Sequence, residues 1–233
     1  MSGLLGRKLG MTHKFNEDGR FVPVTVIEAG PCFVIQKKAN SIQVGFGKIA
    51  DRRLARPQSG VFKKISVEPQ AFIKEIKVDK PQEYNIGQAI KVDIFKEGDF
   101  VDVTGVSIGK GFQGGVKRWH WSGGPKSHGS MSHRRVGSIG ASSDPSRVFK
   151  NTHMPGHMGN SRITVQNLRV VSVDSENNML SVKGSVAGHK NSYVIIRKAK
   201  KRGDINALKA EAAAREAEKK QSKPKGKKNI KKK

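Results

Sequence analysis

Residues 105–162 gather most of the side chains in this chain that could do chemistry. These 58 residues hold 12 of the 26 glycines, five of the seven histidines, nine lysines or arginines and one acid, Asp144. Aromatic rings such as Trp119, Trp121 and Phe149 are interleaved with the cations, a combination that suits phosphates and bases. Large apolar residues are few, and ordering so much glycine costs entropy. The composition therefore predicts a segment that takes its final shape when it is threaded into folded RNA.

The histidines also raise the hypotheses of a metal site and of a hydrolase. Pro155 and Gly156 separate His153 from His157, so a shared helix face is not expected, and the segment offers only Asp144 as a further ligand. Zinc sites normally draw on a tighter set of ligands, and a serine–histidine triad needs an orienting carboxylate. We therefore expect the histidines to stack on bases or to hydrogen-bond to phosphate, with no metal, no cofactor and no small-molecule substrate.

Residues 109–114 fit the pattern G-x-G-x-x-G and follow a predicted strand. A dinucleotide site would also need a following helix and an acidic residue about 20 positions later. Residues 123–125 (Gly-Gly-Pro) would end such a helix early, and Asp144 is the first acid that follows. A nucleotide-binding enzyme that uses this loop stays an alternative. The favoured interpretation is that the glycines let the backbone turn and approach phosphates closely, while nearby cations neutralise them.

The positive charge extends beyond this segment. The chain of 233 residues has a formal net charge of +26 and a pI near 10.4, and residues 204–233 account for only +7 of that charge. Self-repulsion of this size predicts a polyanionic partner. No apolar run reaches the ~20 residues that a membrane span needs, so no membrane contact is expected. Cys32 is the only cysteine; it predicts a reducing compartment and is interpreted as a small apolar strand residue.

The elements that must position the central segment are short strands with turns between them. Strands are expected at residues 21–27, 32–36, 41–46, 75–78, 89–95, 100–106, 163–173, 179–183 and 192–197, with a hairpin joining the first two. Short helices are expected at 57–64 and 69–74, because each range starts with a proline. Residues 204–220 are alanine-rich and predict a helix, and 221–233 predict disorder.

The predicted fold class is mainly β: a closed barrel with short helices, a long extended loop insertion and a basic helical or disordered C-terminal tail. Neither β region is large enough for a full core, so residues 1–104 and 163–203 are expected to form one discontinuous barrel domain, with 52–95 as a small α+β excursion. Residues 105–162 would be an insertion whose ends lie close in space, and 204–233 the tail. A structureless insertion this long is usually functional.

Six motifs stand in order along the chain. They are 6–12 (GRKLGMT), 103–114 (VTGVSIGKGFQG, with Lys117 and Arg118 after it), 128–130 (HGS), 132–134 (SHR), 137–140 (GSIG) and 154–159 (MPGHMG). Together they resemble the L-three family of large-subunit ribosomal proteins, of the bacterial type. In some bacterial members a glutamine directly after the Gly-Ser-Ile-Gly motif is methylated. Ala141 stands there in this chain, so that modification is not carried over.

The resemblance implies a β-barrel of the translation-factor type on the subunit surface and a long finger that runs inward through ribosomal RNA. It implies binding to large-subunit rRNA early in assembly, with neighbouring large-subunit ribosomal proteins as further partners. It also implies a finger tip near the peptidyl transferase centre that performs none of its chemistry. The location implied is ribosome-bound and cytoplasmic. Asp144 is an unusual charge for a finger so close to RNA.

Charge and family pattern together select the candidate rRNA contacts. Phosphate contacts are expected from Arg7, Lys8, Lys110, Lys117, Arg118, Lys126, Arg134, Arg135, Arg147, Lys150 and Arg162, and stacking or base-edge contacts from Trp119, Trp121, His128 and His133, with His153 and His157 completing the set. Two alternatives stay open. The rings of Trp119, Trp121 and Phe149 could form a small apolar cluster that closes the segment on itself. An architectural DNA-binding protein shares the charge, but the loop offers no helix or ribbon for a groove.

Overall fold

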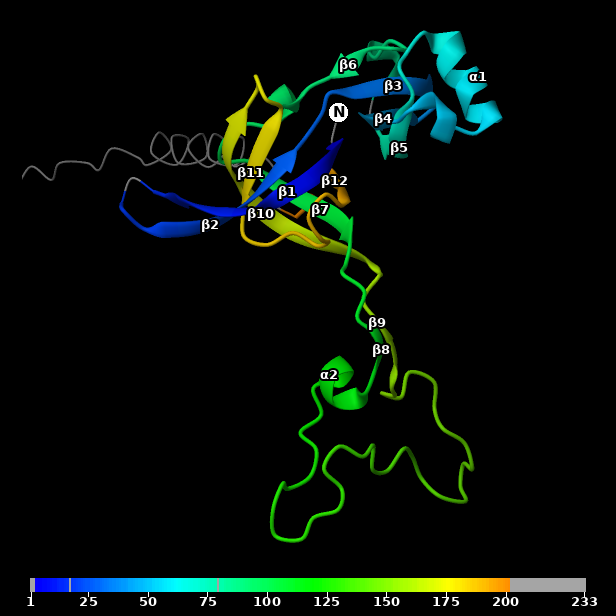
Figure 1. The fold of residues 1–233 in the computed structure, drawn as a ribbon, viewed down its shortest axis with the longest axis vertical. Helices are drawn as coiled ribbons and strands as arrows, with labels where there is room; N and C mark the ends of the chain where they lie inside the picture. The colour runs from blue at the N-terminus through cyan, green and yellow to red at the C-terminus, as the bar shows by residue number, and fades with distance from the viewer. Residues whose placement is uncertain (1–2, 17, 79, 202–233) are drawn as a thin grey trace, which may run out of the picture. The chain divides into compact units, whose positions relative to one another are not determined.

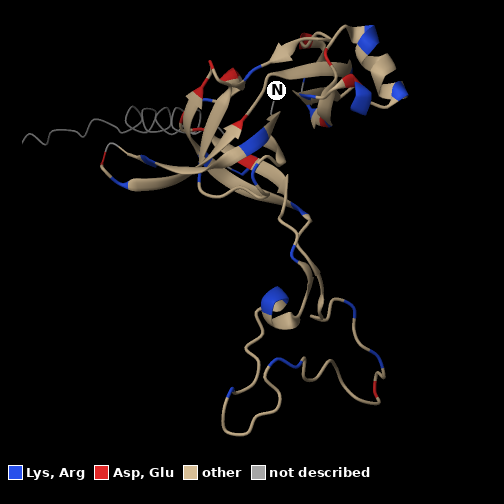
Figure 2. Ribbon diagram, in the orientation of Figure 1, with Lys and Arg blue, Asp and Glu red and all other residues tan. Residues whose placement is uncertain are grey.

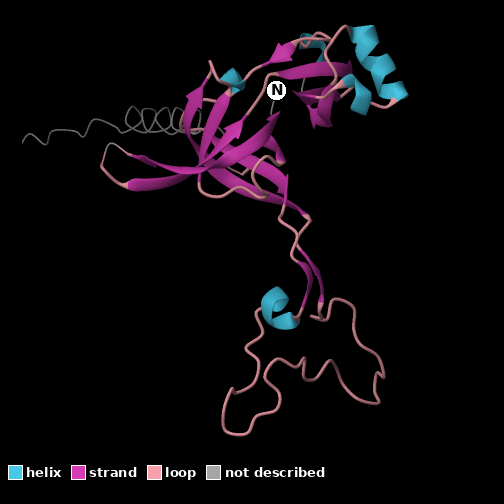
Figure 3. Cartoon of the chain, in the orientation of Figure 1, coloured by secondary structure: helices cyan, strands magenta, loops and turns pink. Residues whose placement is uncertain are grey.

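The structure is a computed structural model that describes residues 3–16, 18–78 and 80–201. Strands dominate it and the helices are few and short (Figure 3), which confirms the predicted mainly-β fold class. The strands are β1 (Gly3–Phe15), β2 (Phe21–Glu28), β3 (Cys32–Lys37), β4 (Ser41–Lys48), β5 (Gln70–Lys77), β6 (Ala89–Ile90), β7 (Phe100–Val106), β8 (Gly111–Gln113), β9 (Gly156–Met158), β10 (Arg162–Asp174), β11 (Met179–Lys183) and β12 (Tyr193–Lys198). The α-helices are α1 (Arg56–Ile65) and α2 (Gly115–Trp119), and three 3-10 turns cover Asp51–Arg53, Pro81–Glu83 and Val92–Ile94.

The chain divides into two compact units. One combines the described residues up to Gly105 with the described residues from Thr164 to Lys201, and the other is Val106–Ile163. Six strands of the first unit form a closed barrel in the order β1-β12-β7-β10-β11-β2 (Figure 1). Three of these strands precede the central segment and three follow it, so the barrel takes strands from both β regions.

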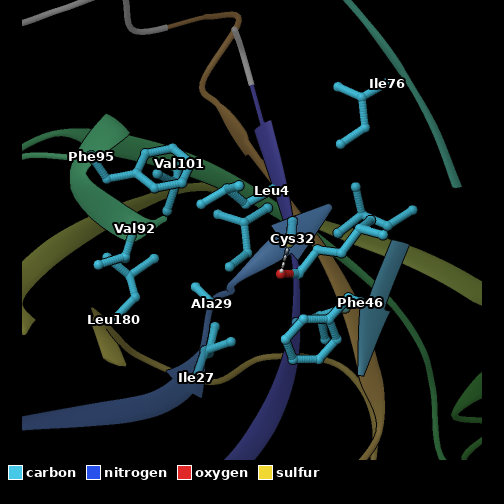
Figure 4. Close-up of a cluster of buried hydrophobic side chains, with 14 of the residues drawn as sticks. Leu4, Ile27, Ala29, Cys32, Phe46, Ile76, Val92, Phe95, Val101 and Leu180 are labelled. Carbon is cyan, nitrogen blue, oxygen red and sulfur yellow. Dashed lines mark hydrogen bonds between the residues drawn. The ribbon is translucent and has the colours of Figure 1, made fainter. Parts of the chain in front are cut away.

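Alternating side chains fill the barrel, because successive residues of a strand point to opposite faces. On β11, Leu180 and Val182 are buried and their neighbours are not; on β7, Val101 and Val103 flank the half-exposed Asp102. Figure 4 shows Leu180 and Val101 in this core. Fully burying one such aliphatic side chain contributes about 1.5–3 kcal/mol, so the barrel supplies a core for the whole first unit.

A second sheet, in the order β5-β4-β3-β6, shares this core. Its buried residues Ile42, Val44 and Ile76 belong to the same apolar cluster as the barrel residues. The ring of Phe72 on β5 stacks on that of Tyr193 on β12, with centroids 4.8 Å apart and planes 4° from parallel. Helix α1 lies beside this sheet (Figure 1), and its one buried residue is Phe62. Its range confirms the helix predicted at residues 57–64.

Three local predictions were wrong. Strands β2 and β3 do not form a hairpin: β2 pairs with β1 and β11, and β3 with β4 and β6. Gly30, at φ +109°, lies at the turn where the chain leaves the barrel for the second sheet. No helix forms at residues 69–74: from Gln70 on they belong to the strand β5, because Phe72, Ile73 and Ile76 pair along β4. Strand 89–95 shortens to Ala89–Ile90, and a 3-10 turn follows it.

Strand β1 was not predicted, because its sequence is rich in glycine and cations and poor in β-branched residues. Its glycines allow strand neighbours to approach closely. A Cβ on Gly3 would lie 2.5 Å from the carbonyl oxygen of Ile196, and a Cβ on Gly6 would lie 2.5 Å from that of Glu28. Pairing with β12 on one side and β2 on the other therefore makes a strand that local propensity does not indicate.

Cys32 begins β3 and is fully buried, as the sequence predicted for a small apolar strand residue. Its Sγ donates to the carbonyl oxygen of Leu5 at 3.3 Å (Figure 4), and burial raises the pKa of the thiol to about 12. Among the described residues, no helix is long and apolar enough to cross a membrane. The helix and disorder predicted within residues 204–233 lie outside the described residues.

Candidate nucleic-acid interface

Two backbone hydrogen bonds hold the two ends of the unit Val106–Ile163 together. The Ser107 N–H donates to the Ser161 carbonyl at 2.9 Å, and the Asn160 N–H donates back to the Ser107 carbonyl at 3.1 Å. Beyond these bonds, β8 pairs antiparallel with β9, with Phe112 opposite His157. The two ends of the segment therefore lie side by side, as an insertion requires.

Next to the ribbon formed by β8 and β9, the side chains of Arg118, Trp119 and His153 gather near the Met154 carbonyl. We call this group the clasp. Helix α2 supplies Arg118 and Trp119: the guanidinium donates to the Met154 oxygen at 2.6 Å, and the indole Nε1–H donates to it at 2.8 Å. The Trp119 ring stacks on the His153 ring at 4.0 Å between centroids, with planes 5° from parallel. A Cβ on Gly156 would lie 2.8 Å from Arg118, so glycine leaves room for the guanidinium.

Trp121 takes part in the same small structure. Gly115 is buried, and a Cβ added there would overlap the Trp121 ring. The segment therefore does use Trp119 and Trp121 within itself, although their partners are a histidine, a carbonyl and a glycine. Phe149 is exposed, and the Arg147 guanidinium lies 5.5 Å from its ring centre. These contacts do not bring Trp119, Trp121 and Phe149 together in one apolar cluster, which was the alternative that the sequence left open.

The unit Val106–Ile163 has no hydrophobic core of its own. Gly115 is its only buried residue, and none of the buried apolar residues of the described chain lies within it. Large apolar side chains are instead exposed, from Trp119 at 36% to Phe112 at 77% and Met131 at 89%. Most of residues 120–155 are loop (Figure 3). The residues of this unit therefore do not cover these side chains themselves.

The cations of this unit face outward. Lys110, Lys117, Lys126, Arg134, Arg135, Lys150 and Arg162 are all exposed. None of the ion pairs between described residues includes a side chain of this unit. Figure 2 shows blue positions spread along the unit, and Asp144 is the one acid in its sequence. Arg118 and Arg147 differ, because both lie against aromatic rings. The structure therefore leaves most of this charge available to a polyanion.

Arg7 and Lys8, also predicted as phosphate contacts, already have partners in the barrel. Arg7 donates to Glu28 through Nε at 3.0 Å and through its terminal nitrogen at 2.7 Å. Lys8 Nζ donates to the carbonyls of Val186 at 2.8 Å and Gly188 at 2.9 Å, and burial lowers its pKa. Both side chains stabilise the barrel, so phosphate contact by them stays a prediction.

The predicted histidines are not brought together. His133 Nδ1 lies 2.8 Å from the Pro125 carbonyl, His153 is stacked on Trp119, and His157 stands exposed on β9. His128 lies in an exposed turn at φ +57°. Within the part of the chain that the structure describes, no group of three or more histidines, cysteines or acids could hold a metal ion.

The G-x-G-x-x-G motif does not form a nucleotide-binding turn. Residues 111–113 of the motif are the strand β8, and the Lys110 N–H donates to the Met158 carbonyl at 2.9 Å. The helix that follows, α2, has only five residues. Residues 111–113 are therefore extended, and the Lys110 N–H is engaged in the pairing with β9.

Sequence reasoning missed the centre of the clasp, the carbonyl of Met154. A backbone oxygen leaves no mark in the residue types around it, so only the nearby glycine and the two tryptophans could have signalled a close approach. The sequence also predicted no rRNA contact for any residue that lies between Lys8 and Lys110 along the chain, the range that contains the second sheet and α1.

Comparisons with known proteins identify the family of this chain. Residues 2–178 match the family model described as Ribosomal protein L3. The chain is 49% identical over 207 residues to the large ribosomal subunit protein uL3 of Thermosipho africanus, covering 86% of this chain and 100% of that protein. It is 52% identical over 205 residues to the protein of the same name from Carboxydothermus hydrogenoformans, covering 85% and 98%. These relatives are structural proteins of the ribosome rather than enzymes. The chain belongs to the ribosomal protein L3 family.

Proposed function

We propose that this protein is a structural component of the large ribosomal subunit that binds large-subunit rRNA and supports early assembly of the subunit. The observation that carries the proposal is the composition of the unit Val106–Ile163: one buried residue, exposed rings and exposed cations without carboxylate partners. Phosphates neutralise such cations, and bases cover such rings. Relatives named as large-subunit proteins support the choice of RNA.

The clasp around Met154 gives the segment one ordered end. From there, Lys126, Arg134, Arg135 and Lys150 would bind phosphates along the loop, with His128 and His133 as base contacts and Lys110, Lys117 and Arg162 nearer the ribbon. In the family this segment would extend toward the peptidyl transferase centre without taking part in its chemistry. The protein would be ribosome-bound in the cytoplasm, beside neighbouring large-subunit proteins.

The domain boundaries predicted from the sequence fit this proposal. Residues 1–104 with 163–203 would form the docking body, residues 105–162 the part that enters the RNA, and residues 204–233 a basic tail. Val106–Ile163 separates from the rest as its own compact unit, which supports treating it as a functionally distinct part.

Salt-dependent binding of the purified chain to protein-free large-subunit rRNA tests the proposal. With Z phosphates contacted, the slope of log K against log salt should lie between about −0.7Z and −0.9Z. Glutamine substitutions at Lys126, Arg134, Arg135 and Lys150 should make the slope shallower by about one for each residue. A salt-independent interaction, or equal affinity for duplex DNA of the same length, would overturn it.

A further inference from the structure

A second group of cations lies far along the chain from the central segment. Arg52 and Arg53 lie in the 3-10 turn Asp51–Arg53, Arg56 begins α1, and Lys63 and Lys64 lie in its last turn. All five are exposed, and none belongs to an ion pair among the residues that the structure describes. Figure 2 shows these blue positions on α1 and the turn before it.

Helical geometry puts the α1 cations on one side. Arg56, Gly60, Lys63 and Lys64 stand at positions i, i+4, i+7 and i+8, which share a helix face. Phe62, the one buried residue of the helix, lies about 150° around from that face at 100° per residue. The helix thus buries Phe62 and leaves its cationic face exposed.

Folding of the helix does not account for the arginines. Cations in the last turn, such as Lys63 and Lys64, interact favourably with the helix dipole. Arg56 stands at the opposite end, where the dipole disfavours positive charge, and the first turn holds no acid to offset it. Arg52 and Arg53 add two more charges just before that end. An external anion explains this arrangement.

Gly60 is an independent sign of a close external contact. Glycine is among the least favourable residues inside a helix, and Gly60 lies in the middle of α1 without an unusual φ. A Cβ added to it would meet nothing within 4 Å. No neighbour inside the protein therefore requires glycine, and the bare backbone leaves space between Arg56 and the two lysines for a group that approaches closely.

We propose that Arg52, Arg53, Arg56, Lys63, Lys64 and Gly60 form a second RNA-binding surface, the α1 face, which binds the phosphate backbone of a folded RNA. The inference rests on the proposed function and adds a site outside the central segment. An RNA backbone fits better than an acidic protein, because protein interfaces need an apolar centre. The only exposed large apolar residue of α1 is Val61.

The first test compares two triple variants for binding to protein-free large-subunit rRNA. Arg52→Gln, Arg53→Gln and Arg56→Gln together should make the salt slope shallower by about three, one for each phosphate that is no longer neutralised. The matched control is Lys38→Gln, Lys48→Gln and Lys80→Gln, which removes the same charge where Glu75, Glu68 and Glu83 already oppose it. The control should change the slope by less than half as much.

The second test changes bulk without changing charge. Gly60→Gln favours the helix but fills the space between Arg56 and the lysines, so it should raise the melting temperature and weaken rRNA binding severalfold. Tighter folding with weaker binding separates this effect from misfolding. Unchanged affinity for Gly60→Gln would overturn the close approach at this residue.

The outcomes separate the two proposals. If the wild-type chain does not bind rRNA, both fall. If the wild-type chain binds and the arginine variant keeps its affinity and salt slope, the α1 face is wrong and the proposed function stands. If the arginine variant binds RNA normally but no longer enters reconstituted large subunits, an acidic protein partner replaces RNA on this face. Circular dichroism of every variant confirms that the barrel is folded.

Discussion

The indole of Trp119 and the imidazole of His153 lie face to face, 4.0 Å between centroids and 5° from parallel. They join two stretches of the chain that are separated by 33 residues in the sequence. The stack lies close to the carbonyl of Met154, to which both Arg118 and Trp119 donate hydrogen bonds. This stack joins α2 to the chain that returns before β9, in a unit that has no hydrophobic core.

Trp119→Ala should loosen the central segment and leave the barrel intact. The substitution removes the stack on His153 and one hydrogen bond to Met154, while the barrel core is unaffected. We expect limited proteolysis to cut within residues 106–163 at least several times faster, with the same two final barrel fragments, one from each side of the segment. Trp119→Phe, which keeps a flat ring but loses the N–H donor, should give an intermediate rate. Equal rates in all three proteins would contradict the clasp.

Gly115→Ala should displace Trp121, because the added Cβ would overlap its ring. Gly114→Ala is the matched control: it stands one residue earlier, and its Cβ would meet nothing within 4 Å. The chain has only two tryptophans, so intrinsic fluorescence reports on this site. The Gly115 variant should shift emission to longer wavelength, as expected for a more exposed indole, and the Gly114 variant should not.

Lys8→Met should destabilise the barrel although the side chain is a predicted phosphate contact. Two carbonyls, those of Val186 and Gly188, would lose their donor, at a cost of about 1 kcal/mol for a partly exposed site. Lys14→Met on the same strand removes an exposed charge and serves as the control. Thermal unfolding without RNA should show a lower melting temperature for the Lys8 variant only.

The stability of the native state should fall at alkaline pH through Cys32. Burial raises the pKa of its thiol from 9.0 to about 12, so above pH 9 the unfolded chain loses this proton before the native chain does. The contribution is complete below pH 9 and is lost between pH 9 and about 12. Relative to Cys32→Ala, the wild type should lose about 1 kcal/mol per pH unit in that range. A constant difference between the two melting curves would contradict the burial.

Replacing residues 121–148 with a short Gly-Ser linker should leave the barrel folded. None of the buried apolar residues of the described chain lies in that range, and Thr104 and Thr164 remain hydrogen-bonded at 2.8 Å. The melting temperature should stay within a few degrees of the wild type, while incorporation into large subunits should be impaired. Global unfolding of this variant would refute the insertion hypothesis.

The barrel could be predicted because its strands carry the pattern themselves. Val101 and Val103 alternate with polar residues on β7, and Leu180 and Val182 do so on β11. Where the pattern is missing, prediction failed. β1 is held by partners on both sides, and residues 69–74 were predicted as a helix from Pro69 although Phe72 and Ile73 suit a strand. Tertiary pairing decided both cases.

The candidate site could be predicted only as a charge distribution. Sequence showed that residues 105–162 are cationic and lack a core, which the exposure of Lys126 and Arg135 supports. It could not show which cations already have partners, because Glu28 is 21 residues from Arg7 and Val186 is 178 from Lys8. It also passed over Arg56 and Gly60, whose meaning depends on the ends and faces of a helix.

The closure of the barrel through β1 and β12 has a consequence for synthesis. Leu4 faces Ile196 across this last pair of strands, so a nascent chain carries an open sheet edge until residues near 198 have left the exit tunnel. Unpaired edges are sites of wrong pairing, and the cationic loop emerges during that interval. The order of translation therefore exposes the loop to anions before its body has closed, which favours folding of this chain next to nucleic acid or a chaperone.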